Sequence, residues 1–210
     1  MKSVMISINP KHCEFILNGI KTVEVRKTKP KLEAPFKCYI YCTKGDALAY
    51  PCLNNNKFFI LRANNGTVSR RRMTENDIKH NDHSFANGKV IAEFICNKIN
   101  ILFNTYGNPE NYMKDTLPEI LKKSKLSYEE FSSYVGSRAL NNHIYGWHIS
   151  DLNIYEKPKE LNDFKKYNRI CDYSDLGLAI PNCEKCFNKK CFLQRPPQSW
   201  CYVEELLEKE

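Results

Sequence analysis

The sequence lacks any apolar run close to the roughly twenty residues that a membrane-spanning helix needs. Its first residues also lack the long apolar core of a secretory signal peptide. Neither an internal repeat nor a low-complexity tract is present. These absences exclude membrane-spanning and repeat proteins, and they lead us to expect a cytoplasmic protein without a membrane partner.

What is present is typical of a folded chain. The 210 residues are 42 % hydrophobic and include twelve tyrosines and eleven phenylalanines, enough for one domain, with or without an appendage. The net charge is +8, and the first 37 residues alone hold eight lysines or arginines against three glutamates. Such a basic region favours a phosphate-bearing partner. The alternative is a lysine-rich surface that only keeps the protein soluble.

Apolar periodicity and capping residues predict the elements. We expect helices at about 10–18, 109–124 and 127–136, and strands at about 3–8, 22–27, 36–43, 57–62, 88–104, 143–154 and 200–203. Residues 63–87 are polar, include the run 70–72 of arginines, and are interpreted as a long loop.

The most informative stretch runs from Gly19 to Arg26, and we call it the signature. Gly19 ends the first helix, and a strand with three charged residues follows. Because side chains alternate along a strand, Glu24 and Arg26 share one face, while Lys21 lies on the other face or in the turn before pairing begins. The spacing fits either a solvated pair on an exposed sheet face or a polar pocket at the mouth of a small barrel.

A resemblance favours the pocket. The segment 7–10, the helix after it and the G-x-K-x-x-E-x-R pattern of the signature resemble the ASCH domain, a branch of the PUA-like β-barrel superfamily, in its phage and prophage type. The segments 37–42, 88–94 and 145–149 fit the same family, so that most of residues 1–160 is covered.

The resemblance implies an α+β fold, a mixed and mostly antiparallel PUA-like β-barrel with a packed N-terminal helix. We expect the barrel in residues 1–166, with a helical insertion at about 109–136. A Cys-rich appendage would follow in 167–195, and residues 196–210 would supply the closing strand and a short polar helix or tail from residue 204.

The resemblance also implies binding of nucleic acid, RNA in the first place, or of a modified nucleotide, in a basic cleft at the signature. The candidate ligand contacts are Lys21, Glu24, Arg26, Tyr41, Trp147, His148, Arg195 and Trp200. An aromatic side chain can stack on a base and an arginine can hold a phosphate. Buried aromatic side chains that contact no ligand are the ordinary alternative.

Two other functions stay open. The first is a hydrolase, either a ribonuclease or a nucleoside amidohydrolase, in which Lys21 and Glu24 would be catalytic. In the amidohydrolase branch of the family a threonine nucleophile stands where this chain has Glu24. The second is a phage-type factor that binds another protein. The oligomeric state is not predicted by the sequence.

Ten cysteines in a chain without a signal peptide are expected to be reduced thiols. Cys183, Cys186 and Cys191 are closely spaced, and thiolates at such spacing can share one tetrahedral Zn²⁺. We expect a structural zinc site with Cys171 as fourth ligand, because Cys201 lies in the last predicted strand. A loop of free thiols and an iron–sulfur cluster are the alternatives.

Overall fold

The protein is described from a computed structural model. The described residues are 1–44, 47–49, 59–61, 86–103, 117–136, 143–167, 170–173, 178–181 and 191–206. For residues 47–49, 59–61, 103, 117, 170–173 and 178–181 the backbone alone is described. The arginine run at 70–72 lies outside these ranges.

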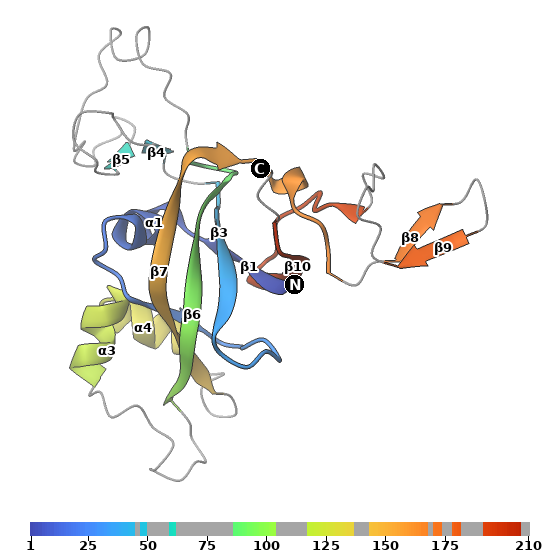
Figure 1. The fold of residues 1–210 in the computed structure, drawn as a ribbon. Helices are drawn as coiled ribbons and strands as arrows, with labels where there is room; N and C mark the ends of the chain where they lie inside the picture. The colour runs from blue at the N-terminus through green and yellow to red at the C-terminus, as the bar shows by residue number, and fades with distance from the viewer. Residues whose placement is uncertain are drawn as a thin grey trace, which may run out of the picture.

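A six-stranded mixed sheet forms the body of the molecule (Figure 1), in the order β10-β1-β3-β6-β7-β2. The strands are β1 (Lys2–Ile8), β2 (Val23–Arg26), β3 (Phe36–Cys42), β6 (Val90–Phe103), β7 (Ile144–Lys159) and β10 (Trp200–Glu204). β1 and β3 are parallel, and the other four pairs are antiparallel. The α+β class and the mixed, mostly antiparallel sheet are as predicted.

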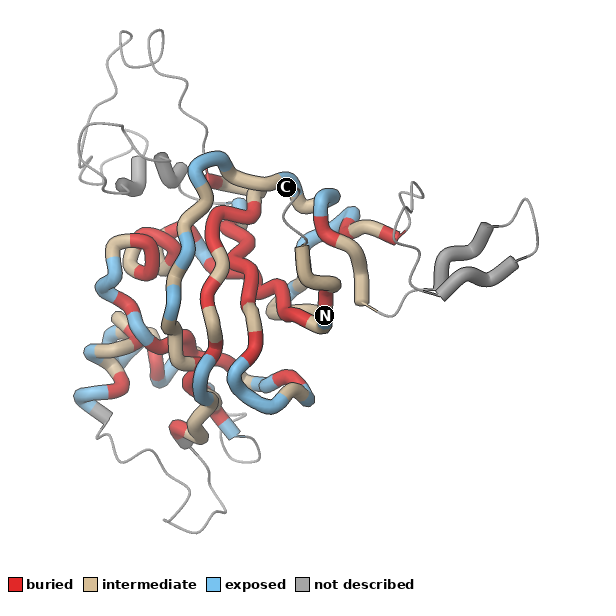
Figure 2. Tube along the Cα trace, in the orientation of Figure 1, coloured by how far each residue is buried: buried red, intermediate tan, exposed pale blue. Residues whose placement is uncertain are grey.

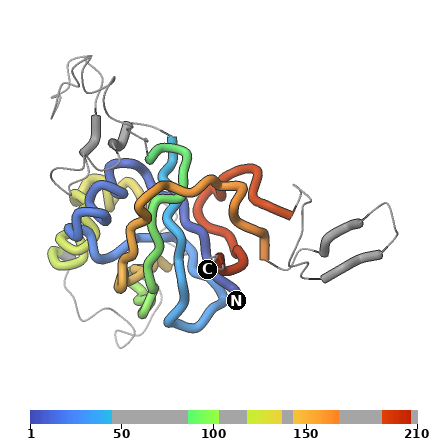
Figure 3. The backbone as a smooth tube through the Cα atoms, turned by 45° about the horizontal axis from the view of Figure 1, so that its top comes forward, coloured from blue at the N-terminus to red at the C-terminus, as the bar shows by residue number. Residues whose placement is uncertain are grey.

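The helices gather on one side of the sheet in both backbone views (Figures 1 and 3). They are α1 (Pro10–Leu17), α3 (Leu117–Ser124) and α4 (Tyr128–Val135). A 3₁₀ turn at Leu161–Asp163 follows β7. Two separate two-stranded pairs are β4 (Ala47–Ala49) with β5 (Phe59–Leu61) and β8 (Ile170–Tyr173) with β9 (Leu178–Pro181). No helix in the described residues is long and apolar enough to cross a membrane.

Most predicted elements are confirmed, with shifted ends. The helix predicted at 109–124 is described from Leu117 onward, because residues 109–116 lie outside the description. The strand predicted to stop at 154 continues to Lys159. Glu204, which we placed in a polar helix or tail, instead pairs with Lys2 in β10, because the ladder to β1 extends one residue further.

Local chemistry sets the turn from β1 into the signature. Asn9 caps α1, its side-chain oxygen accepting a hydrogen bond from the Lys11 N–H at 3.0 Å, and Pro10 occupies the first helical turn. Gly19 has a φ of +69°, a left-handed conformation that glycine adopts without steric cost. The chain therefore turns back after α1 and enters β2 with Lys21 still in the turn.

Buried side chains pack on both faces of the sheet, and the buried stretches of Figure 2 follow β1, β3 and β6. The largest buried cluster joins β1, α1, β3 and β6, and a second surrounds Tyr39 and Phe164. A third cluster attaches α3 and α4 to β2 and β7 through side chains such as Ile120 and Phe131. The last cluster fixes the helices beside the signature.

Candidate functional site

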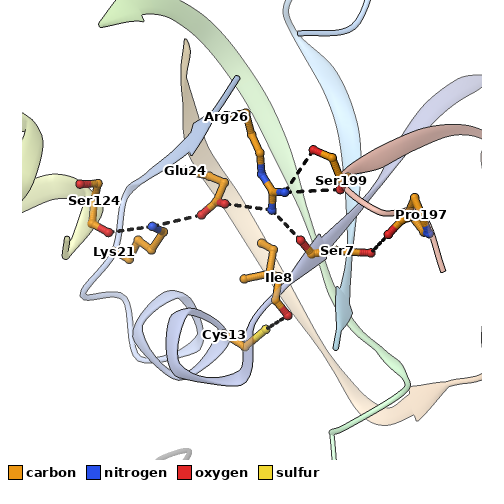
Figure 4. Close-up of polar contacts among 9 residues, drawn as sticks. All are labelled: Ser7, Ile8, Cys13, Lys21, Glu24, Arg26, Ser124, Pro197 and Ser199. Carbon is orange, nitrogen blue, oxygen red and sulfur yellow. Dashed lines mark hydrogen bonds and ion pairs between the residues drawn. The ribbon is translucent and has the colours of Figure 1, made fainter. Parts of the chain in front are cut away.

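The three charged side chains of the signature meet in one buried group (Figure 4). Lys21, Glu24 and Arg26 are 2 %, 6 % and 8 % exposed. Glu24 lies between the two cations, with its Oε2 atom 3.1 Å from Lys21 Nζ and its Oε1 atom 2.9 Å from Arg26 Nη2. The structure therefore contradicts the reading of these charges as a solvated pair on an exposed face.

Lys21 is held from two sides. Its backbone N–H donates to the Phe15 carbonyl at 3.0 Å, and its Nζ donates to the Ser124 carbonyl at 2.7 Å (Figure 4). The Thr22 N–H donates to the Lys123 carbonyl at 3.0 Å beside it. The end of α3 thus aligns the ammonium group with Glu24.

Arg26 joins the two edges of the sheet. Its Nη2 atom donates to the Ser7 carbonyl of β1 at 2.6 Å, and Nη1 lies 3.3 Å from the hydroxyl of Ser199, which precedes β10. Ser7 in turn donates its hydroxyl to the Pro197 carbonyl at 2.6 Å. Since β2 and β10 are the end strands of the sheet, one guanidinium group spans the opening between them.

These side chains line a cavity of about 500 Å³ between β1, β2, α1 and α4. We call it the signature cavity. Its walls are Ser7, Ile8, Asn9, His12, Lys21, Glu24, Val25, Arg26, Leu126, Glu130, Ser133 and Tyr134. The volume falls within the range of small-molecule sites, about 300 to 1,000 Å³.

The ionisation of Glu24 follows from its neighbours. Burial opposes the charged form, but the charges of Lys21 and Arg26 outweigh burial and hold the pKa of the Glu24 carboxyl below its ordinary value. The carboxylate is therefore ionised at neutral pH, and the buried group carries one net positive charge.

His12 is a cavity residue that the sequence analysis missed. Burial, reinforced by the charge of Lys21, lowers its pKa to about 4, so the imidazole is neutral at pH 7. Its position was predictable in part, because His12 stands four residues before the buried Ile16 and thus on a neighbouring part of the helix surface. That α1 turns this surface toward β2 depends on tertiary packing, which spacing alone does not reveal.

Three buried polar atoms at the cavity have bonding capacity left. Among the described residues, His12 Nδ1, Glu24 Oε2 and Arg26 Nε have no hydrogen-bond partner. Glu24 Oε2 forms the 3.1 Å ion pair with Lys21, and as a carboxylate oxygen it can accept from a further donor. Buried polar groups are normally satisfied by protein groups or by ordered water, so these three atoms give the cavity donors and acceptors for a polar ligand or for solvent.

The rim of the cavity is formed by α4 and the start of α1. Lys11 Nζ lies 2.5 Å from Glu130 Oε1, and the other oxygen of Glu130 accepts from the Ser127 N–H that it caps. Burial raises the pKa of Tyr134, with Glu24 acting in the same direction and Arg26 against it. The tyrosine is thus a neutral hydroxyl at this rim.

The other predicted ligand contacts lie elsewhere. Trp147 is fully buried and packs edge-on against Phe36, so no face of its ring is open to a base. Tyr41 is 4 % exposed in the second core cluster. Trp200, half-buried, donates its indole N–H to Thr28, while His148 is half-buried and Arg195 exposed. None of these five residues lines the signature cavity.

The predicted zinc ligands are described only in part. Cys183 and Cys186 lie outside the described residues, and Cys171 is in β8, where the backbone alone is described. Cys191 is buried, and its carbonyl accepts from the Lys166 N–H at 2.9 Å. Within the described residues no group of three or more side chains is arranged to hold a metal ion. The zinc site stays a prediction.

Comparison with known proteins gives structural likenesses alone. No protein-family model and no curated protein sequence matches the chain. Solved structures similar to it include the ASCH protein of Zymomonas mobilis, with 13 % identity and a TM-score of 0.48 over 97 % of this chain and 88 % of that one. Two mutants of the same protein have 13 % and 12 % identity and TM-scores of 0.48 and 0.47. They cover 98 % and 97 % of this chain, and 92 % and 89 % of their own.

These structural neighbours are ASCH proteins. They are of the family that the signature resembles, and they align with nearly the whole chain. The phage type stays a prediction. We base the functional proposal on the geometry of the signature cavity.

Proposed function

We propose that this protein binds nucleic acid, RNA in the first place, or a modified nucleotide, with one nucleotide unit in the signature cavity. The observation that carries the proposal is the convergence of His12, Lys21, Glu24 and Arg26 on a cavity of about 500 Å³. Their remaining donors and acceptors match a ligand that presents both kinds of group, as every nucleobase does at its edges.

Charge supports an anionic ligand. Two cations, one carboxylate and a neutral imidazole leave the buried group with one net positive charge, inside a chain of net charge +8. Lys21 and Arg26 can donate to phosphate or carbonyl oxygens, whereas Glu24 Oε2 can accept from an amino group of a base. The ion pairs hold all three side chains in place before a ligand arrives, which lowers the entropic cost of binding.

The test compares two lysines that are both ion-paired. Lys21→Met keeps an unbranched side chain up to the Cε position and removes the ammonium group from the cavity. The control is Lys37→Met, since Lys37 pairs with Glu93 and Glu205 and does not line the cavity. Affinity for end-labelled small RNAs is measured on native gels, with thermal unfolding of each variant as a check of folding.

We expect Lys21→Met to lower RNA affinity about tenfold or more, as for the loss of a charge-assisted hydrogen bond, and Lys37→Met to leave it unchanged. Equal affinities of the two folded variants would contradict a site in the signature cavity. A wild-type protein that shifts neither RNA nor modified nucleotides would remove the proposal altogether.

A ribonuclease is the second candidate, and the observation that favours it is the neutral His12. An imidazole with an unpartnered Nδ1 can take the proton of an RNA 2′-hydroxyl, while Lys21 and Arg26 hold the phosphate. Its pKa of about 4 makes it a weak base at neutral pH, so binding is our first candidate function and cleavage the second. Denaturing gels of the same samples distinguish cleavage from binding. RNA fragments that form with the wild-type protein and not with His12→Gln would establish cleavage.

For the amidohydrolase alternative the structure adds an obstacle. The position of the threonine nucleophile in that branch is Glu24 here, whose carboxylate is engaged by two cations. We therefore do not propose that activity.

A further inference from the structure

The segment Lys27–Lys31 leaves the signature cavity and carries a lysine at every second position, Lys27, Lys29 and Lys31. We call it the lysine segment. It follows directly after Arg26 of the cavity wall, and its Lys27 ammonium lies 4.7 Å above the ring centre of Tyr134, another wall residue. The segment and the cavity are therefore continuous.

Aromatic side chains fix the lysine segment along its length. The Lys29 ammonium lies 5.7 Å from the ring centre of Tyr145, within the range of a cation–π contact. The indole of Trp200 donates to the Thr28 hydroxyl at 2.9 Å, and the Lys31 N–H donates to the Tyr202 hydroxyl at 2.6 Å. Together with the Tyr134 contact, four successive attachments hold a segment that has no regular secondary structure.

The charges of the lysine segment are available to a partner. Thr28, Lys29 and Lys31 are exposed and Lys27 is half-buried. None of the three lysines forms an ion pair with a residue that the structure describes, in contrast to Lys11, Lys37 and Lys89, each of which contacts a glutamate. Glu33, two residues further on, is the acidic residue of the same link. Three ammonium groups that have no acidic partner among the described residues thus stand within about 14 Å of chain, an upper limit set by full extension.

We propose that the lysine segment is a backbone-binding track for single-stranded RNA, which continues from the nucleotide held in the signature cavity. The ammonium groups would contact successive phosphates, and the aromatic rings would position the lysine side chains. A duplex is rigid, whereas a single strand can place one nucleotide in a cavity and lay the next ones along an adjoining segment. This proposal rests on the proposed function and assigns its ligand to an oligonucleotide.

The experiment separates the track from the cavity. Binding of fluorescent RNAs of 2, 4, 8 and 12 nucleotides and mixed sequence is measured by anisotropy between 50 and 400 mM salt. The test variant is K27Q/K29Q/K31Q, with K29Q/K31Q as a second variant in case the half-buried Lys27 is needed for folding. The charge-matched control is K98Q/K122Q/K157Q, which changes three exposed lysines outside the cavity wall.

Each phosphate contact to a single strand contributes about −0.7 to the slope of log K against log salt concentration. The triple variant should therefore flatten the slope by about 2 and bind the 12-mer about a hundredfold more weakly at 0.1 M salt. Tyr145→Leu, which removes one ring but no charge, should weaken binding about two- to fivefold and leave the slope unchanged.

Three results would overturn the track. The first is a loss of affinity in K27Q/K29Q/K31Q no larger than that in its control. The second is a wild-type affinity that does not rise from the dinucleotide to the 12-mer. The third is a loss of affinity in the triple variant that is as large for a 12-base-pair duplex as for the single-stranded 12-mer. In each case, a lower affinity of Lys21→Met for short RNAs would still support the proposed function. If the wild-type protein binds neither RNA of any length nor modified nucleotides, both the proposed function and the track are contradicted. If it binds modified nucleotides alone, only the track is contradicted.

Discussion

At the scale of single residues, burial decides the chemistry of the signature. An isolated buried charge is costly, and it persists only where partners compensate for the lost hydration. Glu24 is compensated by Lys21 and Arg26, and these two by the carbonyls of Ser124 and Ser7. Burial and the charge of Lys21 keep His12 neutral, and its Nδ1 atom has no hydrogen-bond partner among the residues that the structure describes.

The neutral state of His12 predicts a loss of stability in mild acid. The folded pKa of about 4 lies below the value of 6.5 for a free histidine, so the unfolded chain binds the proton more readily. The part of the free energy of unfolding that depends on a neutral His12 is complete above pH 6.5 and is lost as the pH falls toward 4. It amounts to at most about 3 kcal/mol. Urea unfolding at successive pH values between 7.5 and 4.5 measures it.

Replacement of His12 by Gln should flatten this pH dependence, since glutamine does not titrate. The charged groups that act on His12 are Lys21, Glu24, Lys11 and Glu130, and all four are retained in the variant. A wild-type curve and a His12→Gln curve that run parallel between pH 6.5 and 4.5 would contradict the neutral buried imidazole.

At the scale of elements, the sequence predicted the signature better than its surroundings. The alternation of side chains along β2 correctly placed Glu24 and Arg26 on one face, and Gly19 correctly marked the turn. The burial of that face was not predictable, because it depends on α3 and α4, which follow about a hundred residues later. Likewise, the alternation that marks Trp147 as a strand residue cannot distinguish a core position from a binding surface.

The contacts of Arg26 predict that one side chain holds the edge strands β2 and β10 together. A lysine at this position keeps the charge, but a single ammonium group cannot reach Glu24, Ser7 and Ser199 in the same geometry as the planar guanidinium. Arg26→Lys should therefore speed amide hydrogen exchange in Val23–Arg26 and Trp200–Glu204 and leave β3 and β6 protected.

Exchange measured by mass spectrometry checks this prediction, with Arg195→Lys as the matched control at an exposed position away from the cavity. If exchange in Arg26→Lys rises evenly over all six strands, the arginine stabilises the fold as a whole. If it does not change at β10, the sheet edges are held by other contacts.

At the scale of the whole molecule, the arrangement of charge carries more information than its sum. The composition gave a net charge of +8 but not its location. The structure places a compensated, buried charge group in the signature cavity. Directly after it follow three lysines that form no ion pair with any residue in the described part of the chain. The basic character of the first 37 residues thus indicated the region in which we propose a site, whereas the pairing of each lysine required the fold.

The Cys-rich segment is the part of the molecule for which we propose a metal. We propose that Cys171, Cys183, Cys186 and Cys191 hold one structural Zn²⁺, because their spacing suits a tetrahedral thiolate site. Elemental analysis of protein purified without added metal should give about one zinc per chain. Cys183→Ser and Cys186→Ser should each lose it.

The matched control is Cys201→Ser, which should retain the metal. Cys201 lies in β10 opposite Met5 of β1, and burial raises the pKa of its thiol to about 11, so that it is protonated at neutral pH. Zinc binds the thiolate, and a neutral thiol in a sheet is a poor competitor for that role. If zinc is lost in Cys201→Ser and retained in Cys171→Ser, the fourth ligand is Cys201 and not Cys171. A folded protein without zinc would show that the cysteines are free thiols.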